Sequence, residues 1–172
     1  MQTKWGYTIM KLYHGTNQDI ASIDPKKGLR NKDFGQGFYL TPDYNTARRM
    51  AMKRARLFGG RATVIEYQLD ESCMSNGELN ILEFPRKATE EWAKFVDYNR
   101  TKIDAGRTHC YDIVVGPIAN DGVAYLLGRY HEGTMTLREL AKDLQDKFLD
   151  MQYMFATERA IKCLMKIQIT EI

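Results

Sequence analysis

Two short segments near the start of the chain carry the residue types best suited to chemistry. They are residues 13–16, Tyr-His-Gly-Thr, and residues 34–41, Phe-Gly-Gln-Gly-Phe-Tyr-Leu-Thr. An imidazole can form a directed hydrogen bond with a sugar hydroxyl, and a phenol ring offers a stacking face to a flat aromatic amide. The glycines beside them let the backbone approach a ligand because no side chain intervenes. The pair His14 and Tyr39 therefore indicates binding of NAD at its nicotinamide end.

Short strands and a loop should position this pair. Residues 11–14 are predicted to form one strand and residues 37–41 a second, with a turn or short helix over 17–27 between them. The polar loop over 28–33 carries Arg30, whose guanidinium could neutralise a pyrophosphate through a bidentate contact. A solvated surface arginine without a ligand is the alternative for this residue.

Apolar spacing and capping residues predict further elements along the chain. Strands are expected at residues 62–69, 79–84, 111–115, 152–157 and 165–172, and helices are expected to begin at Thr41 (with a stop at Gly59), Thr89, Asp121, Thr136 and Glu158. The first of these helices should bury Met50 and Phe58, and the helix from Thr136 should bury Phe148. Residues 62–69 alternate between two sides, which is typical of a half-buried strand.

Strands and helices mix without the regular alternation of a doubly wound sheet. We predict one α+β domain over residues 10–172, with two curved, mostly antiparallel β-sheets flanked by helices and a NAD cleft between the sheets. A chain of 172 residues with 44% apolar content can bury the core of one domain. Residues 1–9 are interpreted as an N-terminal extension.

Charge and cysteine content exclude several classes of protein. The net charge of +3 is too small to argue for nucleic acid by itself. The three cysteines, Cys73, Cys110 and Cys163, lie far apart in no CxxC or Cys/His cluster, so we expect neither a disulfide framework nor a metal site. No apolar run approaches the ~20 residues of a membrane span, and the N-terminus lacks the apolar core of a signal peptide. We therefore expect a cytoplasmic protein without a membrane partner.

Common catalytic and nucleotide-binding motifs are absent from the sequence. It holds no G-x-S-x-G nucleophile elbow, no Walker-type phosphate loop and no H-E-x-x-H zinc motif. Residues 35–37, Gly-Gln-Gly, begin like a dinucleotide fingerprint, but no third glycine follows and the glycines enter a strand rather than a helix. A Rossmann-type site is therefore excluded.

The order of four motifs resembles the ADP-ribosyltransferase superfamily, in its diphtheria-toxin and poly(ADP-ribose) polymerase branch. The motifs are residues 13–16, 35–41, 111–117 and 152–157. The chain looks still more like a small bacterial family of uncharacterised domains assigned to that superfamily, and the resemblance covers residues 10–172. It implies an ADP-ribosyltransferase-like fold with NAD as the substrate and no metal.

The resemblance also implies roles for individual residues. In that superfamily the first-motif histidine bonds the adenine-side ribose of NAD, and the next residue holds the nicotinamide amide through its backbone. These roles correspond to His14 and Gly15, with Thr16 fixing the loop, and the second-motif tyrosine that stacks on nicotinamide corresponds to Tyr39. The residues expected to contact NAD are thus His14, Gly15, Thr16, Arg30, Gly37, Phe38 and Tyr39.

The third motif departs from the superfamily at its first position. The superfamily has a glutamate there, which bonds the nicotinamide ribose and stabilises an oxocarbenium-like transition state, whereas this chain has Gln152. An amide accepts a hydrogen bond but brings no negative charge, and charged hydrogen bonds are worth ~1.5–3 kcal/mol against ~1 for neutral ones. The substitution should cost on the order of tenfold or more in rate. His14, Tyr39 and Gln152 are the catalytic candidates.

The resemblance implies a mono-ADP-ribosyltransferase that cleaves the nicotinamide glycosidic bond of NAD and transfers ADP-ribose to a macromolecular acceptor, a protein or a nucleic acid. Small bacterial transferases of this kind often act as toxins or modifiers, so a neutralising partner protein is expected. Gln152 keeps open the alternative of a non-catalytic module that binds NAD or ADP-ribose, or a pseudoenzyme acting through protein contacts. A third hypothesis, a nucleic-acid-binding domain, rests on the basic helix over 43–58.

Overall fold

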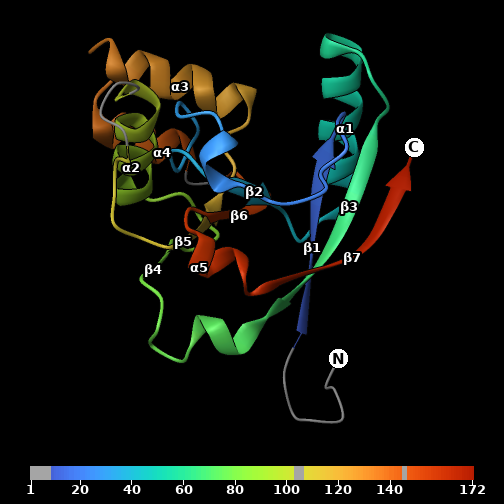
Figure 1. The fold of residues 1–172 in the computed structure, drawn as a ribbon. Coiled ribbons are helices and arrows are strands. Elements are labelled where there is room, and N and C mark those ends of the chain that lie inside the picture. Colours follow the sequence, from blue (N-terminus) through green and yellow to red (C-terminus); the bar gives the residue numbers. More distant parts are fainter. Residues whose placement is uncertain (1–8, 103–106, 145–146) are drawn as a thin grey trace.

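The computed structural model describes residues 9–102, 107–144 and 147–172, which form two β-sheets flanked by helices (Figure 1). Within these residues the first sheet has the strand order β1-β3-β7 and the second has the order β2-β6-β5-β4. Every strand pair is antiparallel except the parallel pair β4–β5. The predicted class, α+β with two mostly antiparallel sheets flanked by helices, is confirmed.

The elements follow one another in a mixed order. The strands are β1 (Ile9–Thr16), β2 (Phe38–Leu40), β3 (Thr63–Asp70), β4 (Ile81–Glu83), β5 (Ile113–Pro117), β6 (Met151–Phe155) and β7 (Leu164–Glu171). The α-helices are α1 (Tyr44–Phe58), α2 (Glu90–Thr101), α3 (Asp121–His131), α4 (Leu137–Leu144) and α5 (Glu158–Ile161), and the 3-10 helices are η1 (Pro25–Lys27) and η2 (Glu71–Met74).

The two sheets pack against each other through an apolar layer. Leu12 and Ile65 of the first sheet are buried in one cluster with Phe38, Ile113 and Phe155 of the second. At one edge of this layer the sheets also join through backbone, because β1 and the residue after β2 exchange two hydrogen bonds. This junction brings the two motif segments of the N-terminal part together.

Helices cover the outer face of each sheet. On the second sheet, α2, α3 and α4 surround a core that includes the fully buried Trp92, and its indole Nε1 donates to the Pro117 carbonyl at 3.1 Å. On the first sheet, α1 packs through Ala47 and Ala51 against Val64. The predicted alternation of β3 is confirmed, because Ile65, Tyr67 and Leu69 are buried on one face, and α1 adds only Val64 as a buried residue of the other face.

Helix starts follow local capping chemistry. The N-cap of α1 is Asp43, whose Oδ1 accepts from the Thr46 N–H at 2.6 Å, and not the predicted Thr41, whose backbone is engaged in the sheet junction. Likewise α3 is capped by Asn120 and not by Asp121. The predicted capping box of α4, Thr136 with Glu139, is present in both directions.

Three large apolar side chains that were expected inside are exposed. They are Met50 (46% exposed), Phe58 (71%) and Phe148 (80%). The small side chains of Ala47 and Ala51 make the buried contact between α1 and the first sheet, and Met50 is not part of it. Phe58 and Phe148 instead lie beneath arginine side chains, with the Arg54 and Arg86 guanidinium carbons 5.7 and 4.2 Å from the ring centroids.

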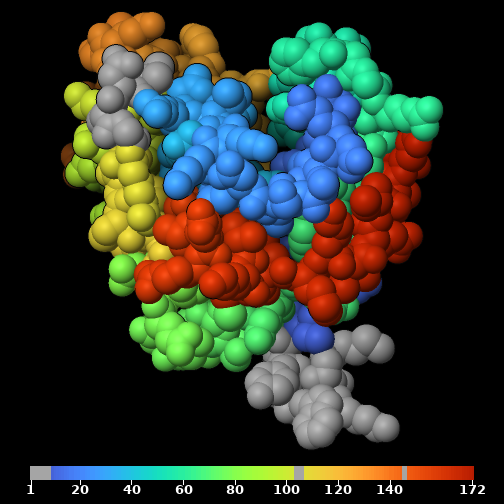
Figure 2. All heavy atoms as spheres, in the orientation of Figure 1, coloured from blue at the N-terminus to red at the C-terminus, as the bar shows by residue number. Residues whose placement is uncertain are grey.

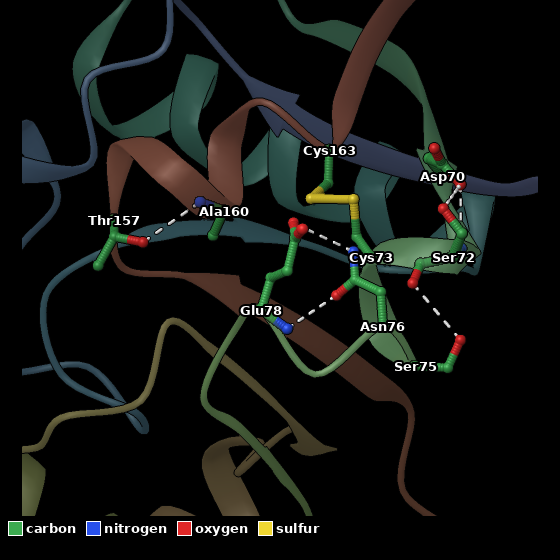
Figure 3. Close-up of a disulfide and its surroundings, with 9 residues drawn as sticks. All are labelled: Asp70, Ser72, Cys73, Ser75, Asn76, Glu78, Thr157, Ala160 and Cys163. Atoms are coloured by element: carbon green, nitrogen blue, oxygen red, sulfur yellow. Dashed lines mark hydrogen bonds between the residues drawn. A yellow bond between two sulfur atoms is a disulfide. The ribbon is translucent and has the colours of Figure 1, made fainter.

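A disulfide links Cys73 of η2 to Cys163, between α5 and β7 (Figure 3). The two residues are 90 positions apart, and their Cα atoms are 6.2 Å apart. The expectation that no disulfide forms is therefore wrong, because the pairing of β3 with β7 brings the ends of these strands together. Cys110 is an exposed free cysteine.

The predicted N-terminal extension lies outside the described residues except for Ile9, which already pairs with Asp70 in β1. In the described part of the chain, no helix combines the length and the apolar character needed to cross a bilayer.

Candidate functional site

A cavity of about 900 Å³ lies beside the junction of β1 and β2. Figure 2 shows the segment between these strands (blue) at the centre of one face of the molecule, between α1 (teal) and the helical side (yellow and orange). This segment supplies much of the cavity wall. The sequence-predicted residues that line the cavity are His14, Gly15, Thr16, Gly37, Phe38, Tyr39 and Gln152. Arg30 is exposed and lies outside this wall.

The junction fixes His14 against the backbone of β2. Tyr13 and Thr41 exchange backbone hydrogen bonds of 2.8 and 2.9 Å, which place His14 beside Tyr39. His14 Nδ1 is 2.7 Å from the Tyr39 carbonyl oxygen, and its ring stacks on Phe38 with centroids 4.4 Å apart. Since a carbonyl only accepts, Nδ1 carries the proton and Nε2 keeps a lone pair.

The His14 ring is uncharged at neutral pH. Burial lowers its pKa to about 4, and the nearby charge of Arg54 acts in the same direction, although the bond to the Tyr39 carbonyl opposes them. A neutral imidazole with a free Nε2 can accept a hydrogen bond from a ligand hydroxyl.

The Tyr39 phenol has its hydroxyl fully engaged by protein. It donates to the Gly35 carbonyl at 2.6 Å and accepts from the Phe34 N–H at 3.0 Å. Burial raises the pKa of Tyr39 well above its usual value. The hydroxyl is therefore unsuited to proton transfer, and the ring face is what this residue can offer to a ligand.

Gln152, on β6, is 8% exposed, and its amide orientation is set by its neighbours. Nε2 donates to Asp33 Oδ2 at 2.8 Å and to the Pro117 carbonyl at 3.3 Å. Because both partners are acceptors, the opposite amide orientation would place two oxygens against each other. Oε1 therefore turns away from Asp33, and among the described residues none donates to it.

Sequence reasoning missed two residues behind Gln152. Asp33 is 7% exposed and forms an ion pair with Arg100 of α2 at 2.7 Å. Both residues line the same cavity. Asp33 directly precedes the second motif, which is a weak signal, but nothing in the sequence connects it with an arginine 67 positions later.

Three further cations, Lys27, Lys32 and Arg54, line the cavity, whereas the predicted Arg30 does not. Lys32 remains exposed overall, but loss of water around its ammonium group lowers its pKa; Asp33 opposes this effect and the charges of Arg54, Arg100 and Lys53 add to it. Arg54 Nε donates to the Asn17 side chain at 3.2 Å. Within the described residues neither Lys32 nor Arg54 forms an ion pair with a carboxylate. The cavity is also lined by the carboxylates Asp19, Asp24, Asp33 and Asp121, so its wall carries both signs of charge.

Protein packing accounts for the motif glycines. A Cβ atom on Gly15 would collide with the Ala47 carbonyl of α1, and one on Gly37 would collide with the Met154 side chain. Thr16 is 3% exposed, and its hydroxyl accepts from the Gln18 N–H at 3.1 Å, which holds the first turn after β1. Packing alone therefore requires glycine at positions 15 and 37; their backbones line the cavity, and close approach of a ligand to them stays a prediction.

Two of the five basic residues of α1 lie near carboxylates in the described part of the chain. Arg49 pairs with Asp150 at 3.1 Å, and Lys53 lies 3.9 Å from Asp121. Beyond α1, Arg61 pairs with Glu171. The hypothesis of a nucleic-acid-binding surface on this helix stays a prediction. As for metals, no cluster of three or more His, Cys, Asp or Glu side chains that could hold an ion occurs in the described residues.

Comparison with known proteins identifies the family of the chain. A family model described as "Protein of unknown function (DUF3990)" matches residues 10–165, and the chain belongs to this family. The match includes both N-terminal motifs, Asp33, Arg100 and Gln152. A search of curated proteins finds no match.

Proposed function

We propose that this protein has an ADP-ribosyltransferase-like fold, binds NAD in the cavity beside the β1–β2 junction and acts as a mono-ADP-ribosyltransferase. One observation carries the proposal: His14, Tyr39 and Gln152, which come from three separate segments, line one cavity. His14 and Tyr39 are also directly joined by the 2.7 Å contact between Nδ1 and the carbonyl.

The size and charge of the cavity support a dinucleotide ligand. A volume of about 900 Å³ falls in the upper part of the usual range for ligand sites, roughly 300–1,000 Å³. Lys32 and Arg54 line the cavity and form no ion pair with a carboxylate among the described residues, so both can contact a diphosphate. These two residues take over the role first considered for Arg30.

The side chains can divide the recognition of NAD among them. His14 Nε2 would accept from a hydroxyl of the adenine-side ribose, and the Tyr39 ring would stack on nicotinamide. Gln152 Oε1 would accept from a hydroxyl of the nicotinamide ribose. Each role uses an atom or a ring face that the protein's own contacts leave open.

The reaction would proceed by positioning and electrostatics, since no covalent nucleophile lies among these residues. The bond between the ribose C1′ and the nicotinamide nitrogen breaks, and nicotinamide leaves with the bonding electron pair. The acceptor's nucleophilic atom forms the new bond to C1′ and releases its proton. We include in the proposal a protein acceptor and a neutralising partner protein, as for bacterial toxins or modifiers acting in a cytoplasm.

Incubation of the protein with NAD labelled in the nicotinamide and, separately, in the adenylate tests the proposal. We expect release of nicotinamide and transfer of the adenylate label to a macromolecule. His14→Ala should lower the release by about five- to thirtyfold, since it removes a hydrogen bond worth about 1–2 kcal/mol. His131→Ala, which changes an exposed histidine on α3, is the matched control and should leave it unchanged.

A non-catalytic module that binds NAD or ADP-ribose is the second candidate, favoured by the uncharged amide of Gln152. It predicts saturable NAD binding by calorimetry, weakened by His14→Ala, without any release of nicotinamide. Absence of both binding and release would reject the two candidates together.

A further inference from the structure

The buried carboxylate of Asp33 is held by four hydrogen-bond donors at the back of the cavity. Its Oδ1 accepts from Arg100 Nε at 2.9 Å and from Arg100 Nη2 at 2.7 Å. Its Oδ2 accepts from the Ala119 N–H at 2.9 Å and from Gln152 Nε2 at 2.8 Å. An ionised carboxylate, which only accepts, satisfies all four contacts.

This network ties together segments that are distant in sequence. Asp33 precedes β2, Arg100 lies on α2, Ala119 follows β5 and Gln152 lies on β6. Arg100 Nη2 also donates to the Ala119 carbonyl at 3.2 Å, which closes the network. A buried network in which each partner is satisfied holds its members in one arrangement.

The network has a consequence for the amide of Gln152. A carboxylate that accepts from the amide N–H draws positive character to Nε2, and hydrogen bonds in such a chain polarise one another, so Oε1 becomes a better acceptor. The network therefore fixes the direction of Oε1 and strengthens it as an acceptor.

We propose that Asp33 is a positioning residue for ADP-ribosyl transfer, which holds Gln152 from behind so that Oε1 is a fixed and polarised acceptor where a glutamate at position 152 would act directly. This inference rests on the proposed function. The Gln152 side-chain amide would transmit the effect of the buried Asp33 carboxylate to the ribose. Gln152 would then be a functional residue of the site, although it replaces the glutamate of the superfamily.

The proposal reverses the simple expectation for Gln152→Glu. A glutamate here would place its carboxylate against Asp33 and the Pro117 carbonyl, and two carboxylates that share a site cannot both ionise readily. We expect nicotinamide release by Gln152→Glu to stay at or below the wild-type rate. The double variant Asp33→Asn with Gln152→Glu keeps one carboxylate, one amide and Arg100, and should release nicotinamide faster than either single variant.

Steady-state kinetics of nicotinamide release test the role of Asp33. We expect Asp33→Asn to lower kcat by about tenfold or more while KM changes by less than about threefold, because the effect of Asp33 acts mainly on the transition state. Asp97→Asn is the matched control, since Asp97 lies on the same helix as Arg100 and its carboxylate forms an ion-pair contact only with His131 among the described residues. If Asp33→Asn does not fold, Gln152→Glu decides alone: a rate about tenfold above wild type would overturn the proposal.

Nuclear magnetic resonance of the Gln152 side-chain amide gives a readout that does not depend on activity. We expect its Nε2 protons to exchange slowly with water in the wild type and rapidly in Asp33→Asn, without NAD present. Fast exchange in the wild type, or slow exchange in both, would overturn the positioning role whatever the kinetics. Slow exchange controlled by Asp33 in a protein that neither binds nor cleaves NAD would instead reject the proposed function and leave the amide assignment standing.

Discussion

Two parts of the cavity lining are built in different ways. At the β1–β2 junction, His14 and Tyr39 are held mostly by backbone groups: the Tyr39 carbonyl, the Gly35 carbonyl and the Phe34 N–H. In a second part of the lining, Gln152 is held by the Asp33 side chain, which pairs with Arg100, and by the Pro117 carbonyl. The first part is set by strand pairing between nearby segments, and the second depends on a salt bridge between distant ones. Substitutions should therefore affect stability much more in the second part.

The disulfide offers a way to lower stability without touching either part of the lining. It closes a loop of 90 residues, and the chain-entropy relation gives about 4.6 kcal/mol for a loop of this length. We expect the free energy of unfolding in urea to fall by roughly this amount in the Cys73→Ser, Cys163→Ser double variant. Nicotinamide release should persist below the unfolding transition, and Cys110→Ser should change neither property. Loss of activity in a protein that is still folded would show that the lining depends on this link.

Substitution of Arg100 tests the part of the cavity lining that is held by the network of Asp33, Arg100 and Gln152. Its side chain is 28% exposed and that of Asp33 is 9% exposed, so Arg100→Met leaves a buried carboxylate unpaired and should cost about 3 kcal/mol. Arg49→Met breaks the Asp150 pair, whose side chains are 65% and 43% exposed, and should cost less than about 1 kcal/mol. Equal effects of the two variants on urea unfolding would contradict the comparison.

The pH dependence of stability probes His14. Burial holds its folded-state pKa at about 4, below the ordinary 6.5, so the unfolded chain binds more protons between these values. The stability that the folded protein keeps by holding His14 neutral is fully present above pH 6.5. It is lost as pH falls from 6.5 toward 4, and the free energy of unfolding then decreases by about 2 kcal/mol once partial solvent access is allowed for. Burial also lowers the pKa of His109, so the comparison is between wild type and His14→Asn. If the free energy of unfolding changes with pH in His14→Asn as steeply as in the wild type, His14 is not buried as a neutral ring.

The smallest effect is expected for Tyr39→Phe. The change leaves the Phe34 N–H and the Gly35 carbonyl without their partner and should cost about 1–2 kcal/mol of stability. If only the ring face contacts NAD, the Kd for NAD should change by less than about threefold, since a phenyl ring can stack equally well. Tyr125→Phe, at an exposed tyrosine, is the matched control. A large loss of NAD binding without a loss of stability would assign the hydroxyl to the ligand instead.

Features that depend on neighbouring residues were predictable from the sequence. The capping box of α4, the end of α1 at Gly59 and the strand containing His14 rest on hydrogen bonds and apolar spacing within a few residues. The meeting of His14 and Tyr39 in one cavity was also expected, because the two motifs flank a single short connection. Predicted helix boundaries were wrong where a tertiary contact engages the expected capping residue. Thr41 is an example, because its backbone pairs with β1 and Asp43 caps α1 instead.

By itself, the sequence determined the α+β class and the candidate residues His14, Tyr39 and Gln152, since periodicity and motif spacing are properties of short segments. Only the tertiary structure decided that Asp33 and Arg100 stand behind Gln152, that Lys32 and Arg54 rather than Arg30 line the cavity, and that Cys73 bonds Cys163. The physical reason is that a buried ion pair or a disulfide between distant residues leaves no local pattern. Its partners meet only when strand pairing and core packing have closed the chain between them.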